Sequence, residues 1–250
     1  MSPRPLDKQS LLAREHEIIE AALSILEEID VSQLTMDKVV ERVPYSKGTV
    51  YSHFSCKEDL ISGIGNYALR TMIGLFSRAT EHQGSSRDRY LGMTFAYLIW
   101  SLLKPTLFHT ALCGKSPSVV GKTSPERIKE HEALEQKLMG ILHKLIDGGM
   151  ADGSFVLPPH MNKQQVSFVG WANSFGSIML LADDLNTCAG RYGLYLEREY
   201  FNAINIFLDG LNWKPLSSEY DYRVMIKQFL EERFADELAE LKARGRVLMM

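Results

Sequence analysis

The side chains of this sequence that are best suited to chemistry lie in one short stretch around Lys47, and they are hydrogen-bond donors. Ser46 is a good N-cap for a helix that we expect to run from Lys47 to Phe54. Lys47 and Thr49 would point outward near the start of that helix, and Gly48 would let the backbone come close to a ligand. An ammonium group and a hydroxyl group placed in this way can hydrogen-bond to the edges of DNA bases.

The residues before this helix would hold it at a fixed angle. Apolar residues recur at helical spacing from Met36 to Val43, which predicts an earlier helix with one apolar side. Pro44 ends that helix, because proline has no N–H and disfavours a helical conformation in the preceding residue. The pattern predicts a helix-turn-helix whose second helix would enter the major groove, with Val50 and Phe54 facing the core.

Several short sequence segments around this turn resemble the DNA-binding signature of the tetracycline-repressor (TetR) family. In that family a threonine opens the first helix of the motif, and a run of the form S-x-G-T-x-Y-x-H-F-x-x-K-x-x-L follows. The turn departs from the family pattern, because Val43-Pro44-Tyr45 stands where Ala-Gly-Val is usual, and proline cannot adopt a positive φ. The matching residues are Thr35, Ser46-Lys47-Gly48-Thr49-Val50-Tyr51, His53-Phe54 and Lys57-Glu58-Asp59-Leu60.

The resemblance implies a homodimeric transcriptional repressor that binds a palindromic operator in double-stranded DNA. A small-molecule effector would release this repressor from the operator. Two half-sites about one helical turn apart require a protein with two-fold symmetry. Family members would contact phosphates through residues at the positions of Thr35, Tyr51, His53 and Lys57. The expected DNA-binding residues are Thr35, Ser46, Lys47, Gly48, Thr49, Tyr51, His53 and Lys57.

Charge alone does not indicate a nucleic-acid partner. The chain has a net charge of −3, and residues 1–60 contain seven basic and eleven acidic residues. An uninterrupted acidic potential across the Lys47–His53 face would favour a helical sensor or interaction module without specific DNA binding. A solid bundle without a cavity would favour an architectural DNA-binding protein without an effector. For a DNA-binding protein we expect the acids to lie elsewhere and one face to gather Arg4, Lys8, Lys47, His53 and Lys57.

Helical periodicity continues through the rest of the chain, so we predict an all-α fold. Ser55 and Glu58 form a capping-box pattern that would open a long helix after the helix-turn-helix. We expect four parts: a helix-turn-helix DNA-binding domain (1–56), a connecting helix (57–84), a ligand-binding and dimerisation helical domain (85–215) and a C-terminal extra helix (216–250).

A pocket for the effector would lie in the larger helical domain, because ligand pockets are mostly apolar with a few polar groups. Plain core packing is the alternative for each of these residues. The candidates are Tyr97, Trp100, Phe108, Met139, His143, Trp171, Asn173 and Phe175.

The resemblance also implies a four-helix interface between two copies, built from the helices expected over residues 163–183 and 195–211. Packing within one subunit is the alternative. The candidate interface residues are Gly170, Ser174, Ser177, Ile204, Phe207 and Leu208.

No group of residues points to catalysis, a cofactor or a metal. The three cysteines are far apart, and His131 and Glu135 stand four residues apart but supply only two ligands. The N-terminus lacks the apolar core of a signal peptide, and the longest uncharged run, residues 166–182, is short for a membrane span. We therefore expect a cytoplasmic protein that is not an enzyme and has no membrane partner.

Overall fold

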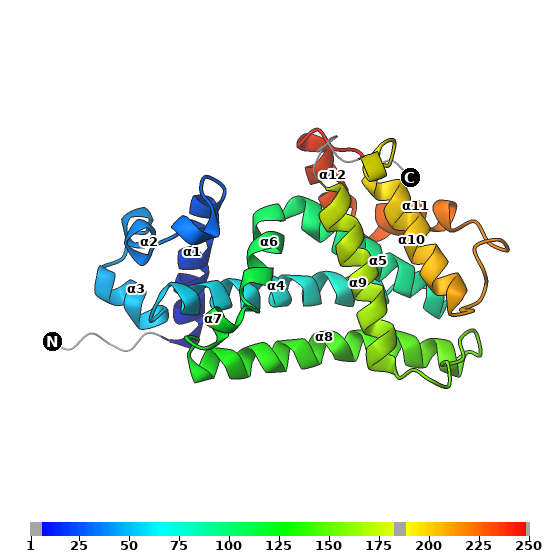
Figure 1. The fold of residues 1–250 in the computed structure, drawn as a ribbon, viewed down its shortest axis with the longest axis horizontal. Coiled ribbons are helices and arrows are strands. Elements are labelled where there is room, and N and C mark those ends of the chain that lie inside the picture. The colour runs from blue at the N-terminus through cyan, green and yellow to red at the C-terminus, as the bar shows by residue number, and fades with distance from the viewer. Residues whose placement is uncertain (1–6, 183–188, 249–250) are drawn as a thin grey trace. The chain divides into compact units, whose positions relative to one another are not determined.

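The computed structural model describes residues 7–182 and 189–248 (Figure 1). These residues form α-helices and two short 3₁₀ helices and contain no β-strand, which confirms the predicted all-α fold. The earlier helices are α1 (Lys8–Leu26), α2 (Met36–Arg42), α3 (Lys47–His53), α4 (Lys57–Thr80), α5 (Ser86–Leu103) and α6 (Pro105–Cys113). They are followed by α7 (Pro117–Val120), α8 (Pro125–Ala151), α9 (Lys163–Leu181), α10 (Leu196–Gly210), α11 (Tyr222–Arg233) and α12 (Ala235–Ala243), and the 3₁₀ helices are η1 (Val31–Gln33) and η2 (Ala189–Arg191).

The chain folds as two compact units. The N-terminal unit consists of Met1–Thr71 and Lys104–Glu135, and the C-terminal unit consists of Met72–Leu103 and Gln136–Met250. The helices α4 and α8 each contribute residues to both units. This division differs from the expected boundaries, because α6, α7 and the first part of α8 fold with the N-terminal helices, where α6 packs on α1.

The helix-turn-helix forms from its caps and its apolar side, as the sequence predicts. The Thr35 hydroxyl accepts the Lys38 N–H at the start of α2, and the Ser46 hydroxyl accepts the Thr49 N–H at the start of α3 (3.4 and 3.2 Å). Val50 and Phe54 are fully buried, which confirms their place in the core. Figure 1 shows α1, α2 and α3 as the first three helices of the chain, coloured in shades of blue.

The turn between α2 and α3 is built without a glycine. None of the residues from Val43 to Ser46 has a positive φ, and Val43 is extended (φ −112°, ψ 152°). The Tyr45 hydroxyl donates to the Glu17 carboxylate, and the Arg14 guanidinium lies over the Tyr45 ring, 4.8 Å from its centroid. Tyr45 thus fastens the turn to α1.

The start of α4 differs from the predicted capping box. The side chain that accepts the Ser55 N–H belongs to Asp59, at 3.1 Å, and not to Glu58, which instead pairs with Lys122 at 2.6 Å. A carboxylate one residue further along the helix therefore joins the end of the α3 segment to α4.

The C-terminal unit is organised around α5, which is buried almost all round and packs against α9, α10, α11 and α12. The predicted C-terminal extra helix is in fact two helices, α11 and α12, separated at Phe234. Among the described residues no single helix is long and apolar enough to cross a membrane; α5 and α6 reach that length and composition only as a bent pair.

A buried arginine joins three elements of this unit. The Arg87 guanidinium is fully buried and lies over the Tyr222 ring of α11, 4.6 Å from its centroid. It also donates to Asp209 and Asn205 of α10, at 2.6 and 3.1 Å. Because a charge buried in this way must be paired, Arg87 ties α5 to α10 and to the first of the two C-terminal helices.

Gly92 tests how closely the C-terminal helices pack on α5. A Cβ at Gly92 would lie 2.4 to 2.8 Å from three ring atoms of the buried Phe229 on α11. We expect Gly92→Ala to lower the free energy of unfolding by about 1–3 kcal/mol, because the added methyl overpacks this contact.

The matched control for this substitution is Gly74→Ala in α4, where a Cβ meets nothing within 4 Å. It should raise the free energy of unfolding by about 0.5–1 kcal/mol, because alanine favours the helix. Urea denaturation followed by circular dichroism measures both values. Equal effects of the two substitutions would contradict the close contact between Gly92 and Phe229.

Candidate nucleic-acid interface

The predicted DNA-binding residues lie at the starts of α2, α3 and α4 and along α3. Lys47, Gly48, Tyr51 and Thr35 are exposed, whereas His53 is half-buried. Thr49 and Lys57 are also half-buried, and Ser46 is exposed with its hydroxyl occupied in the α3 cap. The surface of α3 therefore offers one ammonium group, several hydroxyls and one imidazole.

Lys47 is held in place by two neighbours. Its ammonium group pairs with the Asp37 carboxylate at 2.7 Å and lies over the Tyr51 ring, 5.7 Å from the centroid. The hydrogen bond to Asp37 raises the pKa of Lys47, so the side chain stays charged. Both side chains of the pair are largely exposed, and such surface ion pairs are weak enough to open when a phosphate competes for the lysine.

His53 and Lys57 are positioned by the folded chain. Burial lowers the pKa of His53, although the Glu15 carboxylate acts in the opposite direction, so the imidazole is neutral at pH 7. The Lys57 ammonium group donates to the Ser32 carbonyl at 2.9 Å and so ties the start of α4 to η1. One imidazole N–H and two further N–H groups of Lys57 remain for other acceptors.

The prediction that the acids lie elsewhere is wrong for Asp37, which stands directly beside Lys47. Arg4 lies outside the described residues, and so does the side chain of Lys8. Of the remaining basic residues, Arg42 pairs with Glu28 at 3.4 Å. Both ion pairs join residues of the segment 1–60, so its acidic surplus is unchanged by them.

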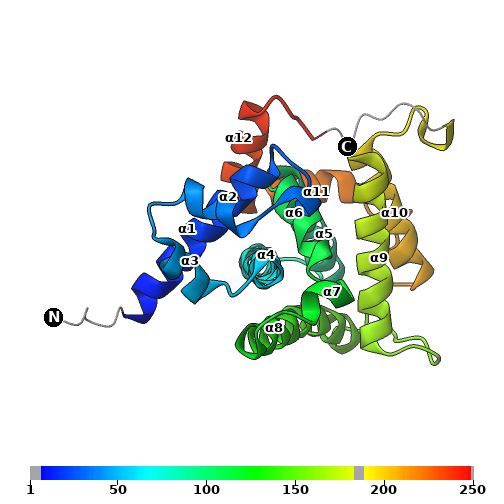
Figure 2. The same cartoon turned by 60° about the vertical axis from the view of Figure 1, so that its left-hand side comes forward.

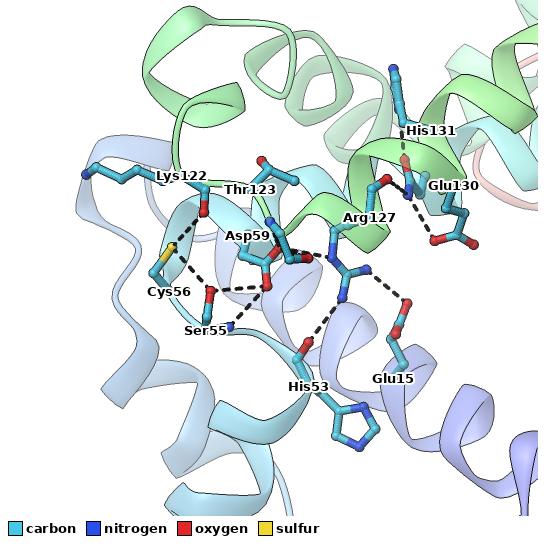
Figure 3. Close-up of polar contacts among 12 residues, drawn as sticks. Glu15, His53, Ser55, Cys56, Asp59, Lys122, Thr123, Arg127, Glu130 and His131 are labelled. Carbon is cyan, nitrogen blue, oxygen red and sulfur yellow. Dashed lines mark hydrogen bonds and ion pairs between the residues drawn. The ribbon is translucent and has the colours of Figure 1, made fainter.

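Behind α3 lies a polar cluster that the sequence did not reveal (Figure 3). Its centre is Arg127 in the first turn of α8, whose guanidinium reaches Glu15, Asp59 and the His53 carbonyl. No local pattern marks Arg127 as special. The available signal was Asp59 in the segment Lys57-Glu58-Asp59-Leu60, a carboxylate in the first turn of a helix with an apolar neighbour.

The candidate effector residues fall into both units. Phe108 belongs to the N-terminal unit, and the other seven belong to the C-terminal unit. The rings of Tyr97 and Trp100 stack at 5.9 Å, and those of Trp171 and Phe175 lie 5.8 Å apart. Burial raises the pKa of Tyr97 to about 12, against a hydrogen bond with Trp171 that lowers it.

The polar candidates are placed differently from one another. The Asn173 amide donates to the Ala203 carbonyl at 2.9 Å and joins α9 to α10. His143 Nε2 is buried and has no hydrogen-bond partner among the described residues, and Met139 lies half-buried one turn earlier on α8. Of these three residues, His143 is therefore the one whose buried nitrogen could accept or donate a hydrogen bond to a ligand.

Several candidate dimer residues serve packing within the subunit. Ile204 and Leu208 are fully buried, and a Cβ at Gly170 would lie 2.3 Å from the Tyr90 hydroxyl oxygen. Ser174 is buried too, the Ser177 hydroxyl donates to the Asn173 carbonyl, and Phe207 is half-buried. Helices α9 and α10 pack against each other and lie side by side in Figures 1 and 2, and the close approach of Gly170 to the Phe207 ring belongs to this contact.

The exposed apolar side chains of α9 and α10 are ones that the sequence analysis did not choose for an interface. Phe168, Met179 and Leu180 lie on the outer side of α9 beside Trp171, and Ile206 lies on α10, 73% exposed. Apolar residues recur at positions 168, 171, 175 and 179, and this second apolar stripe could have indicated the exposed face of α9 from the sequence.

His131 Nε2 lies 3.3 Å from a Glu135 carboxylate oxygen on α8, and His131 Nδ1 lies 2.8 Å from the Asn66 side-chain oxygen. The hydrogen bond from His131 lowers the pKa of Glu135 to about 2. The part of the chain that the structure describes contains no group of three or more His, Cys, Asp or Glu side chains that could hold a metal ion.

The capped helices α2 and α3 define a helix-turn-helix. The family profile described as "Bacterial regulatory proteins, tetR family" matches residues 18–64, which include α2, α3 and the start of α4. Residues 18–64 are therefore similar to the DNA-binding domain of tetR-family regulatory proteins, and this match supports a DNA-binding regulator of transcription. No curated protein sequence matches it.

Solved structures with a similar fold include FadR from Bacillus subtilis in complex with stearoyl-CoA, with a TM-score of 0.59 and 12% identity over 78% of this chain and 98% of that one. A protein of unknown function from Rhodococcus sp. RHA1 has a TM-score of 0.62 and 17% identity over 85% of this chain and 100% of that one. The TetR-family regulator PfmR from Thermus thermophilus has a TM-score of 0.56 and 18% identity over 78% of this chain and 98% of that one. At these identities the likeness concerns the fold.

The Asp37 carboxylate should weaken DNA binding, because it neutralises Lys47 and repels phosphates. We expect Asp37→Asn to tighten binding to duplex DNA about threefold in ~100 mM salt, an effect that shrinks at higher salt as the charges are screened. Glu132→Gln removes the same charge from an exposed position on α8 and should leave the affinity unchanged. Fluorescence anisotropy with a labelled duplex measures both, and equal affinities for the two variants would contradict the role given to Asp37.

Proposed function

We propose that this regulator is a homodimeric repressor that binds a palindromic operator through α2 and α3 and releases it when a small molecule binds. The observation that carries the proposal is the capped, solvent-facing start of α3, where Lys47 and Gly48 are exposed. In this proposal Lys47 and Thr49 reach base edges in the major groove. Phosphate contacts come from Thr35, Tyr51, His53 and Lys57, with Ser46 holding the helix start.

The exposed apolar face of α9 and α10 supports the homodimer. Phe168 is 59% exposed and Ile206 is 73% exposed, and α9 has no charged residue after Lys163. Exposed apolar side chains on two adjacent helices are typical of an interface between subunits. In the dimer, a two-fold axis through this face would pair two copies of α3 with two operator half-sites.

Two buried polar atoms of the C-terminal unit support the response to a small molecule. His143 Nε2 and Ser167 Oγ are buried and have no hydrogen-bond partner among the described residues. Unmet buried polar groups cost free energy, which a ligand with a matching polar group can recover. The similarly folded FadR was solved with stearoyl-CoA, so this fold is able to hold a small molecule.

Release of the operator requires that the effector prefer the conformation that does not bind DNA. A ligand that bound both conformations equally would leave their populations unchanged. By linkage, operator DNA must then weaken effector binding by the same factor as the effector weakens DNA binding.

A helical sensor without specific DNA binding is the second candidate. The observation that favours it is the Asp37 carboxylate beside Lys47, which places a negative charge on the face that would meet phosphates. The two candidates differ in one measurable property, the preference for an operator over unrelated DNA.

A mobility-shift assay with fragments from beside the gene for this protein tests the proposal. We expect one fragment to bind in preference to unrelated DNA, with an affinity that falls steeply as salt rises. Lys47→Ala should lower this affinity about tenfold, whereas Lys129→Ala, at an exposed lysine of α8, should not. A folded protein that binds all fragments equally, or none, would contradict specific operator binding.

The dimer face has its own test. Phe168→Glu should convert the dimer to a monomer, because it places a charge in an apolar contact, and operator affinity should fall at least tenfold with it. Val156→Glu adds the same charge at a side chain that is 79% exposed and outside α9 and α10, and it should remain dimeric. Analytical ultracentrifugation at micromolar concentration measures both, and a dimeric Phe168→Glu variant would remove this face from the interface.

A further inference from the structure

Arg127 lies in the first turn of α8 and contacts three other segments of the N-terminal unit. Its side chain is 8% exposed, and each of its nitrogen atoms has an acceptor. Nε donates to Asp59 at 3.2 Å, and one terminal nitrogen donates to Glu15 of α1, also at 3.2 Å. The other terminal nitrogen donates to the backbone carbonyl of His53 at 3.1 Å (Figure 3).

The His53 carbonyl is the last carbonyl of α3. The final carbonyls of a helix have no partner within the helix and need a donor from elsewhere. A guanidinium is well suited to this task, because it donates and carries a positive charge that complements the negative end of the helix dipole. Arg127 therefore caps the C-terminal end of α3 from a position 74 residues further along the chain, and its guanidinium also lies 4.5 Å from the centroid of the adjacent Phe54 ring.

Asp59 fixes the guanidinium on its other side. One oxygen of its carboxylate accepts from the Ser124 N–H, the Ser124 hydroxyl and Arg127 Nε at 3.0 to 3.2 Å, and the other accepts the Ser55 N–H at 3.1 Å. Burial raises the pKa of Asp59, but these donors outweigh it and hold the pKa below its usual value. The start of α8, the start of α4 and the residue pair after α3 therefore meet at one carboxylate.

The packing around this contact leaves little freedom. A Cβ at Gly63 of α4 would lie 2.5 Å from the Phe54 ring and 3.0 Å from the Arg127 guanidinium. Since α3 is only seven residues long, its own hydrogen bonds do not hold it in place, and its position depends on these contacts.

We propose that Arg127 is a positioning residue for DNA binding, which sets the placement of α3 by capping its C-terminal end and locking it to α1 and α4. The inference rests on the proposed DNA contacts of α3. The His53 side chain and the capped carbonyl belong to the same residue, and Tyr51 lies in the same turn. A shift of this end would therefore displace two of the proposed phosphate contacts while Arg127 itself touches no DNA.

The test compares Arg127→Met with Lys129→Met in the full chain. Both remove one positive charge from α8, and Lys129 is exposed two residues further along the helix. We expect Arg127→Met to lower the affinity for the selected operator fragment at least tenfold and Lys129→Met to change it less than twofold. Arg127→Lys keeps the charge but has no planar fork to serve three acceptors, so it should lie between the two.

Amide hydrogen exchange of the DNA-free protein separates positioning from general stability. In Arg127→Met, the amides of the last turn of α3 and of Phe54 should exchange at least tenfold faster, while those of α2 keep their wild-type rates. Wild-type operator affinity in folded Arg127→Met, or an equal loss of protection across α1, α2 and α3, would overturn the inference. If Arg127→Met does not fold, Arg127→Lys decides by the same two measurements, and wild-type values in both would overturn it.

The failure of the proposed function is distinguishable from the failure of this inference. A wild-type chain that prefers no fragment contradicts operator binding, and with it the DNA part of the inference. The exchange rates of the free protein still decide whether Arg127 holds the end of α3.

Discussion

The buried guanidinium of Arg127 joins the helices on which the N-terminal unit depends. Taking an arginine and a carboxylate out of water costs several kcal/mol per ion, and the cost is recovered only when the pair is well arranged and fully hydrogen-bonded. Here Asp59 and Glu15 supply the opposite charges, and the His53 carbonyl takes the remaining donor direction. Removing either partner would leave a buried charge, so the arrangement is held as a whole.

This cluster helps to explain how a helix as short as α3 is held in one position within the N-terminal unit. The N-terminal end of α3 is fixed by the Ser46 cap and by Tyr45, which is fastened to Glu17 and Arg14 of α1. The C-terminal end is fixed by the Arg127 cap. The exposed residues between these two ends take no part in the core of the unit and face solvent.

Much of this unit could be predicted from the sequence, because caps and apolar periodicity act over three or four residues. The caps at Thr35 and Ser46 and the core positions of Val50 and Phe54 are of this local kind. The contact of Arg127 with His53 spans 74 residues, and no local spacing encodes it. The same holds for Asp59, where the capping-box pattern favoured Glu58 although the carboxylate one residue later lies beside Ser55 and Ser124.

The C-terminal unit was harder to predict for a different physical reason. Helix α9 is apolar on two sides, one of which packs on α10 while the other faces solvent. Periodicity alone therefore could not show that Phe168 of α9 is exposed and that Ile204 of α10 is buried. The break between α11 and α12 falls at Phe234, a buried aromatic residue that continues the apolar pattern without a glycine or proline to mark the end.

In the proposed complex, α3 enters the major groove with phosphate contacts on either side of it. Ethylation interference on the selected operator fragment tests this most directly, because each ethylated phosphate that blocks binding marks one contact. We expect two symmetric sets of blocking phosphates, each flanking one major-groove half-site, with the two half-sites about one helical turn or a multiple of it apart. Blocking phosphates spread evenly along the fragment, or confined to the minor groove side, would contradict it.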